Sequence, residues 1–100
     1  MDPIDPTEEM IGAALREVVE YCIEWGRMHI GWHGGQDRMA ERHITGGQVV
    51  AALRGTLTTD SCVAGVWRYA GRKNGIAAIF TFTIDEDGNR LIVVTLIRED

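Results

Sequence analysis

The chain has 100 residues, of which 45% are hydrophobic and 25% are charged, and its formal net charge is −5. This length and composition are typical of one globular domain with a modest core. No apolar run approaches the roughly 18 residues of a membrane span, and the acidic first residues lack a signal-peptide pattern. We therefore expect no membrane partner. Two cysteines are too few for a disulfide framework, so we expect reduced thiols and a cytoplasmic location.

The charge is distributed unevenly along the chain. Residues 1–26 hold seven carboxylates against one arginine, a net charge of −6. Residues 27–73 hold seven basic residues against three carboxylates, a net charge of +4. The overall acidity argues against a dedicated nucleic-acid binder, but the basic middle segment leaves a local anion site open.

Residues 1–26 are predicted to form an amphipathic helix that packs on a single domain of residues 27–100. Asp5 is the expected N-cap, with Pro6 at the first helical position and Thr7 as the alternative cap. Gly26 is the expected end of the helix. Between them, apolar residues recur one turn apart, at Met10, Ile11, Ala14, Leu15, Val18, Val19, Cys22 and Ile23.

A short strand and two helices are expected next. Residues 27–31 are too few for a helix and indicate a strand, and residues 36–42 indicate a short helix. Thr45 and Gln48 have the spacing of a capping box, which predicts a second helix that ends at Gly55.

After Gly55 the apolar pattern changes to the alternation of strands. We expect strands over residues 63–69 and 76–84 with a turn at 71–75 between them. Residues 85–88 fit a hairpin loop with its glycine in the left-handed conformation, and residues 91–97 are apolar on both faces, as in a strand inside a sheet. The order is a helix followed by β-α-α-β-β-β. This order predicts an α+β fold in which the helices pack on one face of an antiparallel sheet.

The pattern of several residues resembles domain of unknown function family 4258, over about residues 27–98. The matching positions are His33, Arg38-Met39, Arg42, Ile44-Thr45, Ala52-Leu53-Arg54-Gly55, Trp67-Arg68-Tyr69, Gly71 and Val93-Val94-Thr95. That family is in turn similar to RelE/ParE-type and BrnT-type toxins of bacterial toxin–antitoxin pairs. The resemblance implies a RelE-like domain that acts on RNA or translation and has an antitoxin as its partner. Where the family turns with glycine after its second arginine, this chain has His43, for which we expect a left-handed conformation.

Arg38, Arg42 and His33 are the first candidate site residues. The two arginines are four residues apart, hence on one helix face, where they fit a phosphate clamp. The alternative is that they pair with nearby carboxylates or with the acidic first helix. His33 is a candidate general acid or base. Its alternative role is to fix the strand–helix turn by bonding to the backbone.

Arg68, Tyr69 and Arg72 complete the candidate site. Arg68 is grouped with the catalytic candidates, whereas Tyr69 and Arg72 are candidates for binding, since aromatic rings beside arginines stack RNA bases. Trp32 and Trp67 are further candidates for stacking. In the alternative, Trp67 and Tyr69 fill the core while Arg68 faces solvent, and for Trp67 we favour the core.

We expect neither a cofactor nor a metal. Cys22, His29, His33, His43 and Cys62 contain ligand types for zinc, but the two nearest histidines do not share one regular helix. The acidic run at residues 85–89 lacks the glycine position and the closing glutamate of a calcium loop.

The leading hypothesis is a toxin-like protein acting on RNA or translation through Arg38, Arg42, His33 and Arg68. The alternative is a non-catalytic module whose acidic first helix or exposed sheet edge binds a protein partner or a second copy in a homodimer. In a third hypothesis the acidic helix covers the basic middle segment. The sequence alone does not decide whether the protein is an enzyme.

Overall fold

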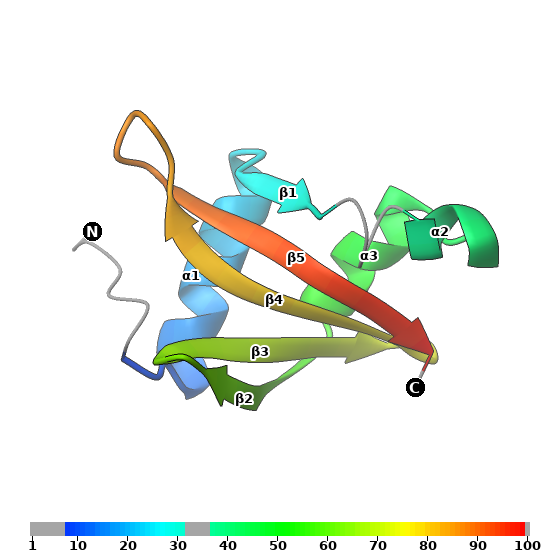
Figure 1. The fold of residues 1–100 in the computed structure, drawn as a ribbon, viewed down its shortest axis with the longest axis horizontal. Helices are drawn as coiled ribbons and strands as arrows, with labels where there is room; N and C mark the ends of the chain where they lie inside the picture. Colours follow the sequence, from blue (N-terminus) through cyan, green and yellow to red (C-terminus); the bar gives the residue numbers. More distant parts are fainter. Residues whose placement is uncertain (1–7, 32–36, 100) are drawn as a thin grey trace.

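The computed structural model describes residues 8–31 and 37–99, without the side chains of Asp37, Arg38 and Arg42. It is an α+β fold, as the sequence predicts, but its one sheet is mixed and has five strands, whereas an antiparallel sheet was expected (Figure 1). No helix in the described ranges is long and apolar enough to cross a membrane. The elements in chain order are α1 (Gly12–Glu24), β1 (Met28–Ile30), α2 (Asp37–Arg42), α3 (Gly46–Leu53), β2 (Thr56–Val63), β3 (Val66–Lys73), β4 (Ile76–Ile84) and β5 (Arg90–Glu99).

The strands lie in the order β1-β5-β4-β3-β2. The four carboxy-terminal strands form an antiparallel meander, and β1 pairs with β5 in parallel. The last strand therefore lies inside the sheet, as its apolar sequence predicts. Near its middle Ile79 pairs with Leu96 whereas Phe80 pairs with Val94, so Thr95 is an extra residue in β5. This irregularity lets both Val94 and Ile97 face the core.

The expectation of three carboxy-terminal strands is wrong, because β2 is an additional strand. Residues 63–69 are not one strand but the end of β2, a turn at Ala64-Gly65 and the start of β3. The next turn is also shorter than expected, since Gly71 belongs to β3 and the turn holds only Asn74-Gly75. Both turns have two residues with positive φ, the arrangement that suits the twist of a hairpin.

The helix α1 begins later than expected, at Gly12 rather than near Asp5. Its N-cap residue Ile11 is extended and provides no side-chain cap. The backbone N–H of Met10 donates to the hydroxyl oxygen of Tyr69, at 2.9 Å. This contact with β3 holds residues 8–11 outside the helix. The proposed caps Asp5 and Thr7 lie outside the described residues.

The other helix ends follow the local signals in the sequence. Gly26 has φ of +67°, and the N–H groups of Gly26 and Arg27 donate to Ile23 and Cys22, which is the hydrogen-bond pattern of a Schellman motif. Thr45 and Gln48 form the predicted capping box. His43 has φ of +56°, so the left-handed turn after α2 is confirmed with histidine in place of glycine.

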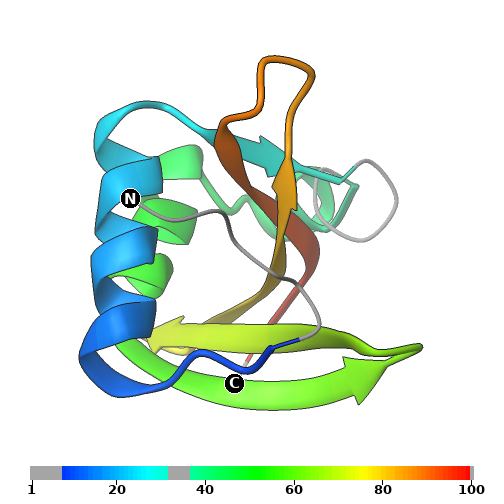
Figure 2. The same ribbon diagram turned by 90° about the vertical axis from the view of Figure 1, so that its left-hand side faces the viewer.

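The helices α1 and α3 form a layer on one face of the sheet, whereas the short α2 lies at the β1 end (Figures 1 and 2). Two glycines let α3 and its following turn approach β3 closely. A Cβ atom on Gly71 would lie 2.6 Å from the carbonyl oxygen of Ala52, and one on Gly55 would overlap the backbone of Arg72. Gly71 is therefore a packing residue of a buried strand and not a turn residue.

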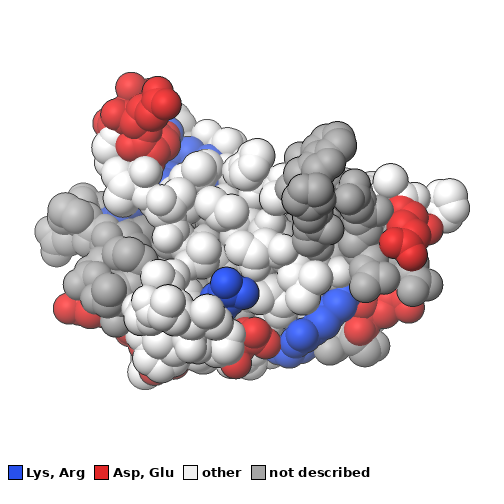
Figure 3. All heavy atoms as spheres, in the orientation of Figure 1, with Lys and Arg blue, Asp and Glu red and all other residues white. Residues whose placement is uncertain are grey.

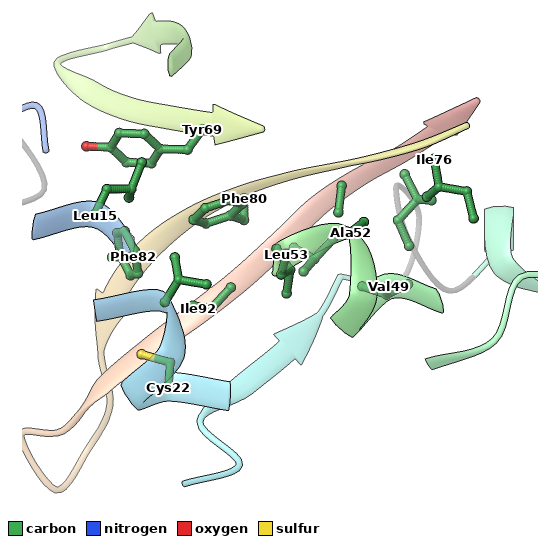
Figure 4. Close-up of a cluster of buried hydrophobic side chains, with 14 of the residues drawn as sticks. Leu15, Cys22, Val49, Ala52, Leu53, Tyr69, Ile76, Phe80, Phe82 and Ile92 are labelled. Atoms are coloured by element: carbon green, nitrogen blue, oxygen red, sulfur yellow. The ribbon is translucent and has the colours of Figure 1, made fainter. Parts of the chain in front are cut away.

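The core lies between the helical layer and the sheet (Figure 4). The ring of Tyr69 packs against those of Phe80 and Phe82, with ring centroids 5.7 and 5.8 Å apart. From the helices, α1 contributes Leu15, Val18, Val19 and Cys22, and α3 contributes Val49, Ala52 and Leu53. The amphipathic helix outside the family resemblance is thus part of the core.

A polar contact also joins α1 to α3. The guanidinium of Arg16 donates to the carbonyl oxygens of Arg54, at 2.8 Å, and of Gly55. These carbonyls follow the last turn of α3, where a cation stabilises the helix dipole. Glu20 accepts from Arg54 at 3.2 Å and lies 3.9 Å from Arg16. The helix α1 therefore contacts one basic residue of the middle segment, Arg54, which follows the last turn of α3.

Candidate ligand-binding face

The sheet has one face that α1 and α3 do not cover, which we call the open face. Side chains alternate between the two faces of a strand, so the buried residues of each strand identify their outward neighbours. Trp67 and Tyr69 pack on the core, which places Arg68 on the open face. By the same alternation and the strand pairing, this face includes His29, Thr58, Arg68, Ala70, Arg72, Ala77, Ile79, Thr81, Leu91, Val93, Leu96 and Arg98. Asp60 has no pairing partner on β3, and its bond to Arg98 places its carboxylate on the same face.

The open face is more basic than the helical layer. It carries three arginines, on β3 and β5, against Asp60 on β2. The helix α1, on the other side of the sheet, carries Glu17, Glu20 and Glu24 against Arg16. Figure 3 shows basic side chains among mostly uncharged atoms on the open face, with an acidic group over the β4–β5 hairpin at its margin. The fold thus places Arg68, Arg72 and Arg98 on the side of the sheet opposite to α1, whereas Arg54 of the basic segment pairs with Glu20 of that helix.

Two of the three arginines are held by side chains of β2. Arg72 donates to the hydroxyl of Thr58 at 2.7 Å. Arg98 donates to Asp60 at 3.2 Å, and the two side chains form a salt bridge. For Arg68, no other described residue provides an ion-pair partner. Arg68 is therefore the open-face cation best placed to receive an external anion.

Tyr69 is not beside Arg68 on the same face, as a stacking site would require. Its side chain is 2% exposed and points into the core, where its oxygen accepts from the N–H of Met10. Burial raises the pKa of the Tyr69 hydroxyl, while the hydrogen bond from Met10 acts in the opposite direction. Trp67 is partly buried against the same core, which is the position that the sequence analysis favours for it. We therefore assign Tyr69 a structural role rather than a binding role.

The candidates on or near α2 are only partly placed. His33 and Trp32 lie outside the described residues, and the side chains of Arg38 and Arg42 are not described. Their backbone forms α2, one turn apart as predicted, and this helix packs against β5. The same strand carries Arg98 nearer its carboxyl end.

Of the residues with ligand types for zinc, Cys22, His29, His43 and Cys62 lie in the described part of the chain. No group of three or more such side chains is found in residues 8–31 and 37–99. Cys22 is buried in the core, which raises the pKa of its thiol, and Cys62 is exposed on β2. His29 is on β1, where it lines a hollow of about 480 Å³ with Met28, Ile30 and Met39.

The acidic residues 85–89 form the predicted hairpin loop. The Oδ1 atom of Asp85 accepts from the N–H groups of Asp87 and Asn89, both at 2.9 Å, and Gly88 has φ of +81°. The Oδ2 atom of Asp85 lies 3.5 Å from Arg27. The carboxylate of Asp85 thus organises the turn, which accounts for its position in the sequence.

Sequence reasoning missed Asp60, Thr58 and Arg98. The first two are on β2, the strand that the sequence pattern did not reveal, and Arg98 became relevant only through its pairing with Asp60. The alternation of side chains along β2 could have indicated this strand, but the irregular pairing between Thr59 and Ser61 interrupts the alternation.

Comparison of the chain with protein-family models, with curated proteins and with solved structures found no match.

Proposed function

We propose that the open face binds RNA and that the protein is a toxin-like protein acting on RNA or translation in the cytoplasm. The observation that carries the proposal is the placement of Arg68, Arg72 and Arg98 on the sheet face opposite to α1 and α3. Arginine binds phosphate through charge-assisted and often bidentate hydrogen bonds. Neutralising phosphates also releases counterions, which drives the binding of nucleic acids.

The spacing of the three arginines suits an extended polyanion. Arg68 and Arg72 are four residues apart on β3, which separates their Cα atoms by about 13 Å. Arg72 and Arg98 both pair with Ala77, on opposite sides of β4, so about 10 Å separates them across the sheet. The backbone of a single strand offers successive phosphates over such distances, so each arginine can contact a phosphate of its own.

The residues that act on the bound RNA are His33, Arg38 and Arg42. Their role rests on the family resemblance, and α2 packs against the strand that carries Arg98. In this arrangement the open face holds the RNA backbone and the α2 end supplies the polar groups. An antitoxin is the partner that the resemblance implies.

RNA binding is tested by fluorescence anisotropy with a labelled single-stranded oligouridylate. Contacts with three phosphates predict that log K falls with log salt with a slope of roughly −2. Arg68→Gln is expected to weaken binding and reduce that slope by about 0.7. Lys73→Gln is the matched control, because it removes one positive charge at the helix-side end of β3. Equal effects of the two substitutions would refute a site on the open face.

The action on RNA or translation is tested by inducible expression in a bacterial host. We expect growth arrest by the wild-type chain, relieved by His33→Ala and by Arg42→Ala. Arrest that is unchanged by both substitutions would remove these residues from the mechanism. Absence of arrest, with RNA binding retained, would leave a binding protein without toxicity.

A second candidate function is a protein-interaction module that uses α1. Ile11 and Trp25 flank this helix and are 68% and 64% exposed, with Glu17 and Glu24 between them. Exposed apolar residues beside carboxylates suit a basic protein surface or a second copy. Light scattering over a range of protein concentrations tests self-association. A monomer at all concentrations, unaffected by Trp25→Ser, would rule out the homodimer.

A further inference from the structure

We propose that Asp60 is a built-in competitor for the anionic ligand of the open face. In the free protein Asp60 forms an ion pair with Arg98, and an RNA phosphate must displace Asp60 to bind this arginine. This inference rests on the proposed RNA-binding function and adds to it a contact that regulates the same site. The carboxylate thereby sets how readily the third arginine becomes available.

The contact joins two distant strands of the sheet. Asp60 is on the edge strand β2 and Arg98 is on β5, with β3 and β4 between them. In a flat sheet three strand spacings amount to about 14 Å, and the two residues are also offset along the strands. A bond of 3.2 Å between them therefore requires a strongly twisted sheet, in which two diagonal corners of the open face approach each other.

The floor beneath the contact is built from small or apolar residues. Ala70 and Ala77 are fully buried and Ile79 is 2% exposed, although no helix of the α1 and α3 layer covers them. Arg98 must pass over β4 and β3 to reach β2, and its pairing partner on β4 is Ala77. Small side chains leave that path clear for the arginine.

The carboxylate of Asp60 is held from two sides. Its Oδ1 atom accepts from Nη2 of Arg98, and its Oδ2 atom accepts from the hydroxyl of Ser61, both at 3.2 Å. Asp60 lies where the pairing of β2 shifts, between Thr59 and Ser61. Such an irregularity re-aims a side chain, and here the carboxylate is directed over the face toward Arg98.

The ion pair of Arg98 and Asp60 is exposed enough for a ligand to replace Asp60. The side chain of Arg98 is 42% exposed and that of Asp60 is 23% exposed. Ion pairs at such exposure are weak, because water and salt compete with them. A backbone phosphate of RNA has one negative charge and two free oxygens, as a carboxylate has. It displaces Asp60 because Arg68 and Arg72 already hold the same RNA strand, which gives the next phosphate a high effective concentration at Arg98. Arg68, which has no ion-pair partner in the described part of the chain, makes the first contact.

A double-mutant cycle with the oligouridylate probe tests the competition. Asp60→Asn is expected to tighten binding by roughly two- to fivefold, the range set by the strength of an exposed ion pair. Arg98→Gln is expected to weaken it. The decisive variant is the double mutant, which should bind like Arg98→Gln alone, because Asp60 acts only through Arg98. Asp87→Asn in the hairpin loop is the control for removal of one negative charge, with an expected change below about twofold.

Each outcome separates the competition from the proposed function. Additive effects of the two substitutions would show that Asp60 merely repels the ligand, which overturns the proposal. Weaker binding by Arg68→Gln with no change in Asp60→Asn would keep the RNA function and overturn the competition. Absence of binding in the wild type and in Asp60→Asn would overturn both. Thermal melting of every variant checks that the fold is retained.

Discussion

The substitution Gly71→Ala tests the close packing of α3 on β3. The added Cβ would lie 2.6 Å from the carbonyl oxygen of Ala52 and 2.8 Å from the Cα atom of Leu53. Both neighbours are backbone atoms, so the helix must shift as a unit. Gly71 does not have positive φ, and the strain is therefore steric rather than conformational.

The expected cost of Gly71→Ala follows from two opposing effects. Overpacking costs about 1–3 kcal/mol, and the loss of flexibility in the unfolded chain offsets about 0.4–1 kcal/mol. The midpoints of these ranges leave a net loss of about 1.3 kcal/mol. Such a loss would lower the melting temperature by roughly 5–10 °C in a domain of this size. Urea denaturation followed by circular dichroism measures the free energy of unfolding.

The matched control for Gly71→Ala is Gly47→Ala. A Cβ on Gly47 would have its nearest contact at 3.8 Å, with the Thr45 hydroxyl, so it fits without strain. We expect stabilisation by about 0.5–1 kcal/mol, because alanine is the better helix former. The reasoning would be refuted if both substitutions stabilised the protein, since β3 and α3 would then not be in close contact.

Three further predictions concern α1 and the core. Arg16→Ala is expected to cost about 1 kcal/mol in the free energy of unfolding, because it removes two hydrogen bonds to carbonyls that follow α3, whereas Glu17→Ala should cost less than about 0.5 kcal/mol. A thiol reagent should modify Cys62 rapidly in the native protein and Cys22 only after denaturation; rapid reaction of both would contradict the burial of Cys22. Because burial raises the pKa of Tyr69 above its ordinary value of 10.0, the stability that its neutral hydroxyl contributes is fully present below pH 10 and is lost as pH rises through the folded pKa. Tyr69→Phe should therefore flatten the alkaline loss of stability, measured by urea denaturation at several pH values.

Local signals predicted most helix ends correctly. The capping box of Thr45 and Gln48, the left-handed Gly26 and the left-handed His43 all depend on residues within one turn. These interactions are set by neighbouring side chains and backbone, so the sequence contains the information directly. Gly88 in the last hairpin belongs to the same class.

The missed strand β2 shows where local signals are insufficient. Its sequence is half polar, and it lies at the edge of the sheet, where one side is exposed. The shift of pairing near Asp60 interrupts the alternation of its side chains. The turn that follows has Ala64 at positive φ, a conformation that alanine rarely adopts, so the usual Asn-Gly signal is missing.

The start of α1 illustrates a tertiary contact that prevails over a local preference. Asp5-Pro6-Thr7 has the form of a helix start, yet residues 8–11 are not helical. The hydrogen bond from Met10 to Tyr69 joins residues 59 positions apart, and no local pattern indicates it. Helix propensity is a weak preference beside such contacts.

The candidate site was predictable by residue type but not by arrangement. Arg68 and Arg72 were identified from the sequence, whereas Tyr69 was grouped with them although adjacent residues of a strand face opposite sides. Arg98 and Asp60 are 38 residues apart and meet only because of the strand order and the sheet twist. Those two properties are set by the whole fold.

The most direct test of RNA binding on the open face is an NMR titration of the isotope-labelled protein with oligouridylate. The side-chain Nε–H signals of Arg68, Arg72 and Arg98 report on this face, and the backbone signals of α1 report on the opposite layer. We predict shifts of the three arginine signals as RNA is added, with α1 unchanged. Shifts confined to α1, or arginine signals that do not respond at saturating RNA, would contradict the proposed binding face.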